Sequence, residues 1–160
     1  MPLRSPVASL CAALGAAAAA VALLFPPLLV VREPANLRDL VASMAAAMLG
    51  VTQVNGLKLL DLARDLDGGT RDAVFVAWAV AAGAAGLALV ACARPRLSRL
   101  LAVAGLAALA ALAIVPRVVG DDRISTLGHL VRASDVSTGF YVALAGFALV
   151  VIGGALGRGG

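Results

Sequence analysis

Four long stretches of this chain carry no charged side chain, and this feature limits the possible folds more than any other. They are Ser5–Val31, Ala73–Ala93, Leu100–Pro116 and Gly139–Gly157. A segment that is apolar all round has no wet face, so it needs lipid or a large protein around it. A chain of 160 residues cannot bury four such segments in its own interior. At about 1.5 Å per residue, each stretch can cross a hydrocarbon core of about 30 Å, the third near the short limit.

These stretches predict an all-α fold, an integral membrane four-helix bundle that occupies residues 1–160 as one domain. The first span is long, and Pro26–Pro27 predict a kink or tilt in its outer part. A secretory signal peptide is the alternative reading of this span, because Arg4 precedes an alanine-rich run with A-x-A triplets. The run exceeds the roughly 7–15 apolar residues of a signal core, so we expect a retained span.

The basic residues are divided unevenly between the two ends of the predicted bundle. Three short segments, before span one, between spans two and three, and after span four, contain basic residues and no acidic residue. Their basic residues are Arg4, Arg94, Arg96, Arg99 and Arg158. The outer loops, 32–72 and 117–138, hold the other eight basic residues and all nine acidic ones. Because positive loops stay cytoplasmic, we expect a multi-pass plasma (inner) membrane protein with both termini in the cytoplasm. This division accounts for the net charge of +4 without a nucleic-acid partner.

Small residues recur along all four predicted spans. Lipid provides no hydrophobic drive for helix association, so close backbone approach becomes important. We predict helix packing at these glycines: Gly15, Gly83, Gly86, Gly105, Gly146 and Gly153. Gly139, Gly146 and Gly153 also follow a heptad spacing on span four, which favours a tight, left-handed bundle.

The first outer loop is predicted to be helical. Asn36 is a candidate N-cap, and the helix that follows has one apolar stripe. The stripe is a candidate face for a partner or a lipid: Leu37, Leu40, Val41, Met44, Met48 and Val51. Short helices are also expected over Leu57–Leu66, ended by Gly68–Gly69, and near Ser125–Arg132. Together they predict a small helical extracytoplasmic cap, which either docks a partner or only seals the bundle.

No catalytic, cofactor or metal site is predicted. Asp61, Asp65 and Asp67 lack the ligand spacing of a calcium loop, and His129 is the single histidine. The spans contain no ionisable Asp, Glu, Lys, Arg or His, which argues against a proton-coupled carrier acting as a single bundle. Trp78 and Tyr141 lie near the outer span ends, where aromatic rings favour the membrane interface without any ligand. We therefore expect no enzyme activity and no cofactor.

The order of parts resembles the claudin-like tetraspan plan, with a long first outer loop, a short basic inner loop and a shorter second outer loop. The Gly-Leu-Trp signature with two loop cysteines is missing, since Asn55–Gly56–Leu57 stands in its place, so tight-junction function is not carried over. The chain is more similar to small uncharacterised bacterial four-span proteins. The shared features are Phe25–Pro26, the Asn-Gly-Leu loop, and a last span that begins Gly139-Phe140-Tyr141-Val142-Ala143-Leu144 and ends in Gly153–Gly154.

These observations favour a non-catalytic membrane subunit or scaffold that works by helix packing with other membrane proteins. The expected partners are the lipid bilayer and other membrane subunits or further copies of the chain. A small oligomeric channel or transporter, and a lipid-binding membrane protein, remain as alternatives.

Overall fold

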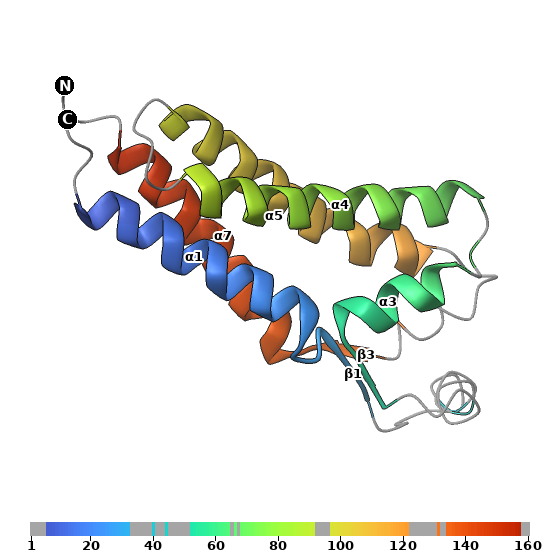
Figure 1. The fold of residues 1–160 in the computed structure, drawn as a ribbon. Coiled ribbons are helices and arrows are strands. Elements are labelled where there is room, and N and C mark those ends of the chain that lie inside the picture. Colours follow the sequence, from blue (N-terminus) through green and yellow to red (C-terminus); the bar gives the residue numbers. More distant parts are fainter. Residues whose placement is uncertain are drawn as a thin grey trace.

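The computed structural model describes residues 6–32, 52–64, 68–91, 97–121 and 134–157, with Leu40, Met44, Leu66 and Val131 as single positions. Its main feature is a bundle of four long helices (Figure 1). These are α1 (Pro6–Leu24), α4 (Gly68–Ala91), α5 (Ser98–Asp121) and α7 (Thr138–Leu156). All four are long and apolar enough to cross a membrane, which confirms the predicted number of candidate spans.

The helices form a closed ring in which α1 lies beside α7, α7 beside α5, α5 beside α4, and α4 beside α1. The contact between α1 and α7 is the most extensive of the four. The start of α1 and the end of α7 lie at one end of the bundle, where α4 also gives way to α5 (Figure 1). We call this the terminal end, and the opposite end the sheet end.

The first helix is shorter than predicted. The apolar run continues to Val31, but α1 ends at Leu24. Pro26 and Pro27 have no N–H to donate to the helix, so the backbone leaves the helical path there instead of bending within it. The β-branched residues that follow, together with Leu29, form strand β1 (Leu29–Val31).

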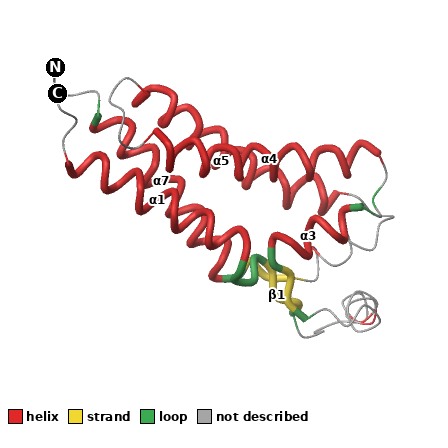
Figure 2. Tube along the Cα trace, in the orientation of Figure 1, coloured by secondary structure: helices red, strands yellow, loops and turns green. Residues whose placement is uncertain are grey.

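The all-α assignment therefore misses a small sheet at the sheet end of the bundle (Figure 2). Strand β1 is central and pairs antiparallel with β2 (Gln53–Val54) and β3 (Ser134–Val136). Further backbone hydrogen bonds join Leu28 N–H to Val54 O at 2.8 Å and Ser137 N–H to Leu28 O at 2.9 Å. The sheet thus ties the end of α1 to the start of α7.

Helix α3 (Gly56–Ala63) lies beside this sheet and confirms the predicted short helix, with an earlier end. The Asn55 side chain caps it by accepting a hydrogen bond from Lys58 N–H at 2.9 Å. The sequence predicts that Gly68–Gly69 end this helix, and this prediction is wrong: the two glycines begin α4.

Helix α5 is longer than the marginal span that the sequence predicts. It continues through Pro116 to Asp121, because Val119 is fully buried beneath the sheet and extends the packed face beyond the uncharged run. The predicted helices along the first outer loop and near Ser125–Arg132 lie outside the described residues, except for Leu40, Met44 and Val131.

The core is built mainly from alanine along the length of the bundle. In its middle layer, Phe147 is fully buried and seven alanines surround it: Ala19, Ala22, Ala81, Ala84, Ala85, Ala108 and Ala143. Larger aliphatic side chains are buried toward the sheet, where Val54, Val74 and Val119 lie together, and at the terminal end, where Leu101 and Val150 are fully buried among alanines. The small side chains let the helix backbones approach closely in the middle and at the terminal end.

Candidate functional site

The predicted packing glycines divide into two groups with opposite environments. Gly15 on α1 and Gly146 on α7 face each other. A Cβ atom on Gly15 would lie 2.5 Å from Gly146 O, and one on Gly146 would lie 2.6 Å from Gly15 O. Both neighbours are backbone atoms, which cannot turn aside, so only glycine fits at this crossing.

The same close approach recurs along α7. A Cβ atom on Gly153 would lie 2.8 Å from both Ala12 N and Ala8 O on α1. Gly154 faces the next helix, where a Cβ atom would lie 2.7 Å from Ala102 N on α5. Two adjacent glycines therefore let α7 pack closely against two different helices. We call the α1–α7 contact, with Gly15, Gly146 and Gly153, the inner glycine seam.

Gly105 on α5 also lies in close contact, but of a softer kind. The nearest neighbour of an added Cβ atom is the Val151 side chain at 2.7 Å, and Phe147 O follows at 3.2 Å. A side-chain methyl group can shift where a backbone atom cannot, so this position is the more tolerant one.

Gly83 and Gly86 on α4 form the second group, which has no close neighbours among the described residues. Among the described residues, no atom outside their own helix lies within 4 Å of a Cβ atom built on either glycine. Both are exposed, so the structure does not use them for packing within the chain. The sequence alone cannot separate them from the seam glycines, because neither residue type nor spacing shows which way a position on an apolar helix faces.

The exposed side of α4 has a consistent shape. Its middle holds the small residues Ala79, Gly83 and Gly86, bordered along one side by the exposed side chains of Val80 and Leu87. Val76 and Val90 project at either end, with exposed fractions of 62% and 67%. Of the four candidate spans, α4 is also the least buried, at 28% of its apolar window against 39% for each of the others. We call this surface the α4 face.

The outer-loop stripe is described at two of its six positions only. Leu40 and Met44 are exposed at 43% and 61%. Leu37, Val41, Met48 and Val51 lie outside the described residues. This candidate partner or lipid face stays a prediction.

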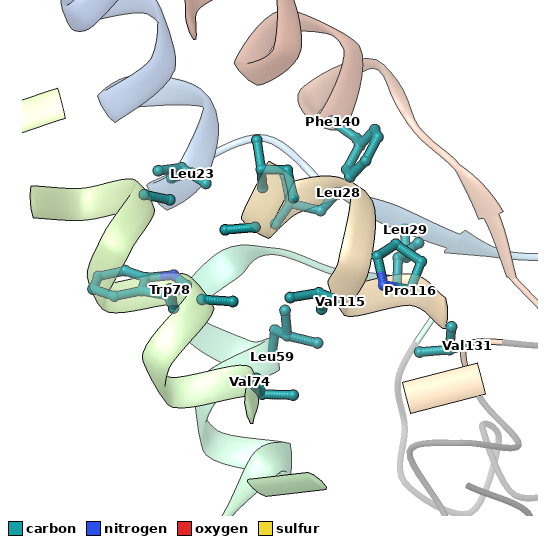
Figure 3. Close-up of a pocket in the computed structure, with 14 residues that line it drawn as sticks. Leu23, Leu28, Leu29, Leu59, Val74, Trp78, Val115, Pro116, Val131 and Phe140 are labelled. Carbon is teal, nitrogen blue, oxygen red and sulfur yellow. The ribbon is translucent and has the colours of Figure 1, made fainter. Parts of the chain in front are cut away.

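An apolar pocket of about 50 Å³ lies at the sheet end, between the bundle and α3 (Figure 3). It is enclosed by the end of α1, the start of β1, α3, α4, α5 and the first turn of α7. Its described wall consists of aliphatic and aromatic side chains, among them Leu23, Leu59, Leu112 and Phe140, and no charged residue is among them.

Trp78 is the one residue with a polar side-chain atom among the described lining residues. Its indole nitrogen is buried and has no hydrogen-bond partner among the described residues. A buried donor without an acceptor costs about 1–3 kcal/mol, and native structures contain few of them. The sequence places Trp78 at a membrane interface and gives it no ligand, so it does not reveal this buried N–H.

Gly56 permits the close approach of α3 to this corner. A Cβ atom on Gly56 would overlap the Leu23 carbonyl oxygen and would lie 3.2 Å from the Trp78 nitrogen. Leu23 O also lacks its usual helical donor, because the residue four positions later is Pro27. The Trp78 N–H and the Leu23 carbonyl oxygen, neither of which has a hydrogen-bond partner within its own helix, therefore both lie beside Gly56.

The charged side chains that the structure describes do not line the pocket. Arg32, next to β1, donates from its Nε atom to Asp135 Oδ2 at 2.9 Å, and from its second nitrogen to Asp135 Oδ1. These hydrogen bonds are the main reason that the pKa of the exposed Asp135 carboxyl is lowered; desolvation opposes the shift and the positive charge of Arg32 adds to it. The pair joins β1 to β3 from outside the sheet.

The acidic residues considered for metal binding do not form a site in the described part of the chain. Asp61 is exposed on α3 and lies 3.7 Å from Arg64, while Asp65, Asp67 and His129 lie outside the described residues. No group of three His, Cys, Asp or Glu side chains is close enough to hold a metal ion within the described ranges.

Comparisons of the chain with family models, with curated proteins and with solved structures find no match.

Proposed function

We propose that this chain is a non-catalytic multi-pass membrane protein that binds a helix of another membrane chain on its α4 face. The exposed glycines of that face carry the proposal. Gly83 and Gly86 have open space where the seam glycines have a neighbouring helix. Small residues let helices approach closely in lipid, where van der Waals packing replaces the hydrophobic drive.

Membrane insertion is the first part of this proposal, and the four long apolar helices support it. The uneven division of basic residues supports an orientation with the terminal end in the cytoplasm of a bacterial inner membrane. The claudin-like order of parts fits the same orientation. Extraction with alkaline carbonate, followed by protease access to each end in sealed vesicles, tests both statements.

The geometry of the α4 face supports the second part. Val76 and Val90 would border a partner helix, while Ala79, Gly83 and Gly86 would let its backbone approach. A lipid chain also covers an apolar face, but it gains nothing from a flat glycine surface, because lipid adapts to any shape. The least buried of the four helices, with two exposed glycines in its middle, is therefore the docking candidate that we propose.

Affinity purification after mild detergent extraction, with crosslinking before lysis, tests the docking. We expect the wild-type chain in a defined oligomer or with a partner, and the Gly83→Leu/Gly86→Leu variant to recover at least about tenfold less of it. Ala145→Leu is the matched control, because Ala145 is exposed on α7, which lies diagonally across the ring from α4. A wild-type chain that is strictly monomeric, with no crosslinked neighbour, contradicts the proposal.

A further inference from the structure

We draw no further inference here: the strongest candidate, the apolar pocket at the sheet end between α3 and the bundle, gives no ligand atom access to the buried Trp78 N–H, and nothing among the described residues shows what occupies it.

Discussion

The inner glycine seam and the α4 face contain the same residue type in the same kind of helix, but their surroundings are opposite. At Gly146 an added Cβ atom meets a backbone oxygen at 2.6 Å, while at Gly83 it meets nothing within 4 Å. The seam glycine is therefore required by the fold of the single chain. The exposed glycine packs against none of the described residues, and in a helix it costs about 1 kcal/mol relative to alanine. The contact proposed for the α4 face would give such a glycine a packing role that it lacks among the described residues.

The largest effect is expected from a substitution that disrupts the inner glycine seam. Gly146→Leu should lower the free energy of unfolding by about 3 kcal/mol or more, because α1 and α7 must separate to admit the side chain. In a chain of this size that corresponds to a melting temperature lower by about 6–12 °C in detergent. Circular dichroism at 222 nm during heating measures it.

The matched control is the same substitution on the α4 face. Gly83→Leu should leave the melting temperature of the monomer unchanged or slightly higher, since leucine favours the helix and meets no neighbour. Equal destabilisation by Gly146→Leu and Gly83→Leu would show that the two glycine groups do not differ within the chain.

A smaller effect distinguishes a backbone obstacle from a side-chain obstacle. Gly105→Ala should destabilise the bundle by about 1 kcal/mol, less than Gly146→Ala, because its nearest neighbour is the Val151 methyl group. The double variant Gly105→Ala/Val151→Ala should recover part of that loss in the same thermal measurement. If the double variant is the sum of the two single losses, Val151 is not the obstacle and the backbone of α7 is.

The sequence predicts the four helices well because their signal is long and one-dimensional, an uncharged apolar run. It does not predict the directions in which glycines face. Gly15 and Gly83 have equivalent alanine-rich surroundings, and only the three-dimensional arrangement of α1 and α4 separates them.

The sheet was missed for a related reason. Leu29–Val31 continues an apolar run, and what ends the helix there is the missing N–H groups of Pro26 and Pro27. Strand partners as far away in sequence as Ser134–Val136 leave no local signal near β1. The N–H of Trp78 is likewise buried because Gly56 and α3 pack beside it. From residue type alone, Trp78 is expected at a membrane interface, so the sequence does not predict this burial.

The smallest effect is expected at the ion pair between Arg32 and Asp135, which links β1 to β3 at the sheet end of the inner glycine seam. It tests whether this ion pair also stabilises the contact between α1 and α7. Arg32 lowers the pKa of Asp135, so the folded state binds a proton at this carboxyl less readily than the unfolded state does. The stabilisation is therefore fully present above the ordinary pKa of 3.8 and is lost as the pH falls through the lower folded value.

Asp135→Asn should lower the melting temperature at pH 7 by no more than about 2 °C, because both side chains are exposed and solvent screens the pair. The difference from wild type should shrink below pH 3.8 and also in about 1 M salt, where exposed charges are screened. Asp61→Asn is the control, because Asp61 on α3 pairs with Arg64 at the end of the same helix, so this ion pair does not connect two separate elements. A loss at Asp135→Asn as large as that at Gly146→Leu would mean that the charge pair, and not close glycine packing, holds α1 against α7.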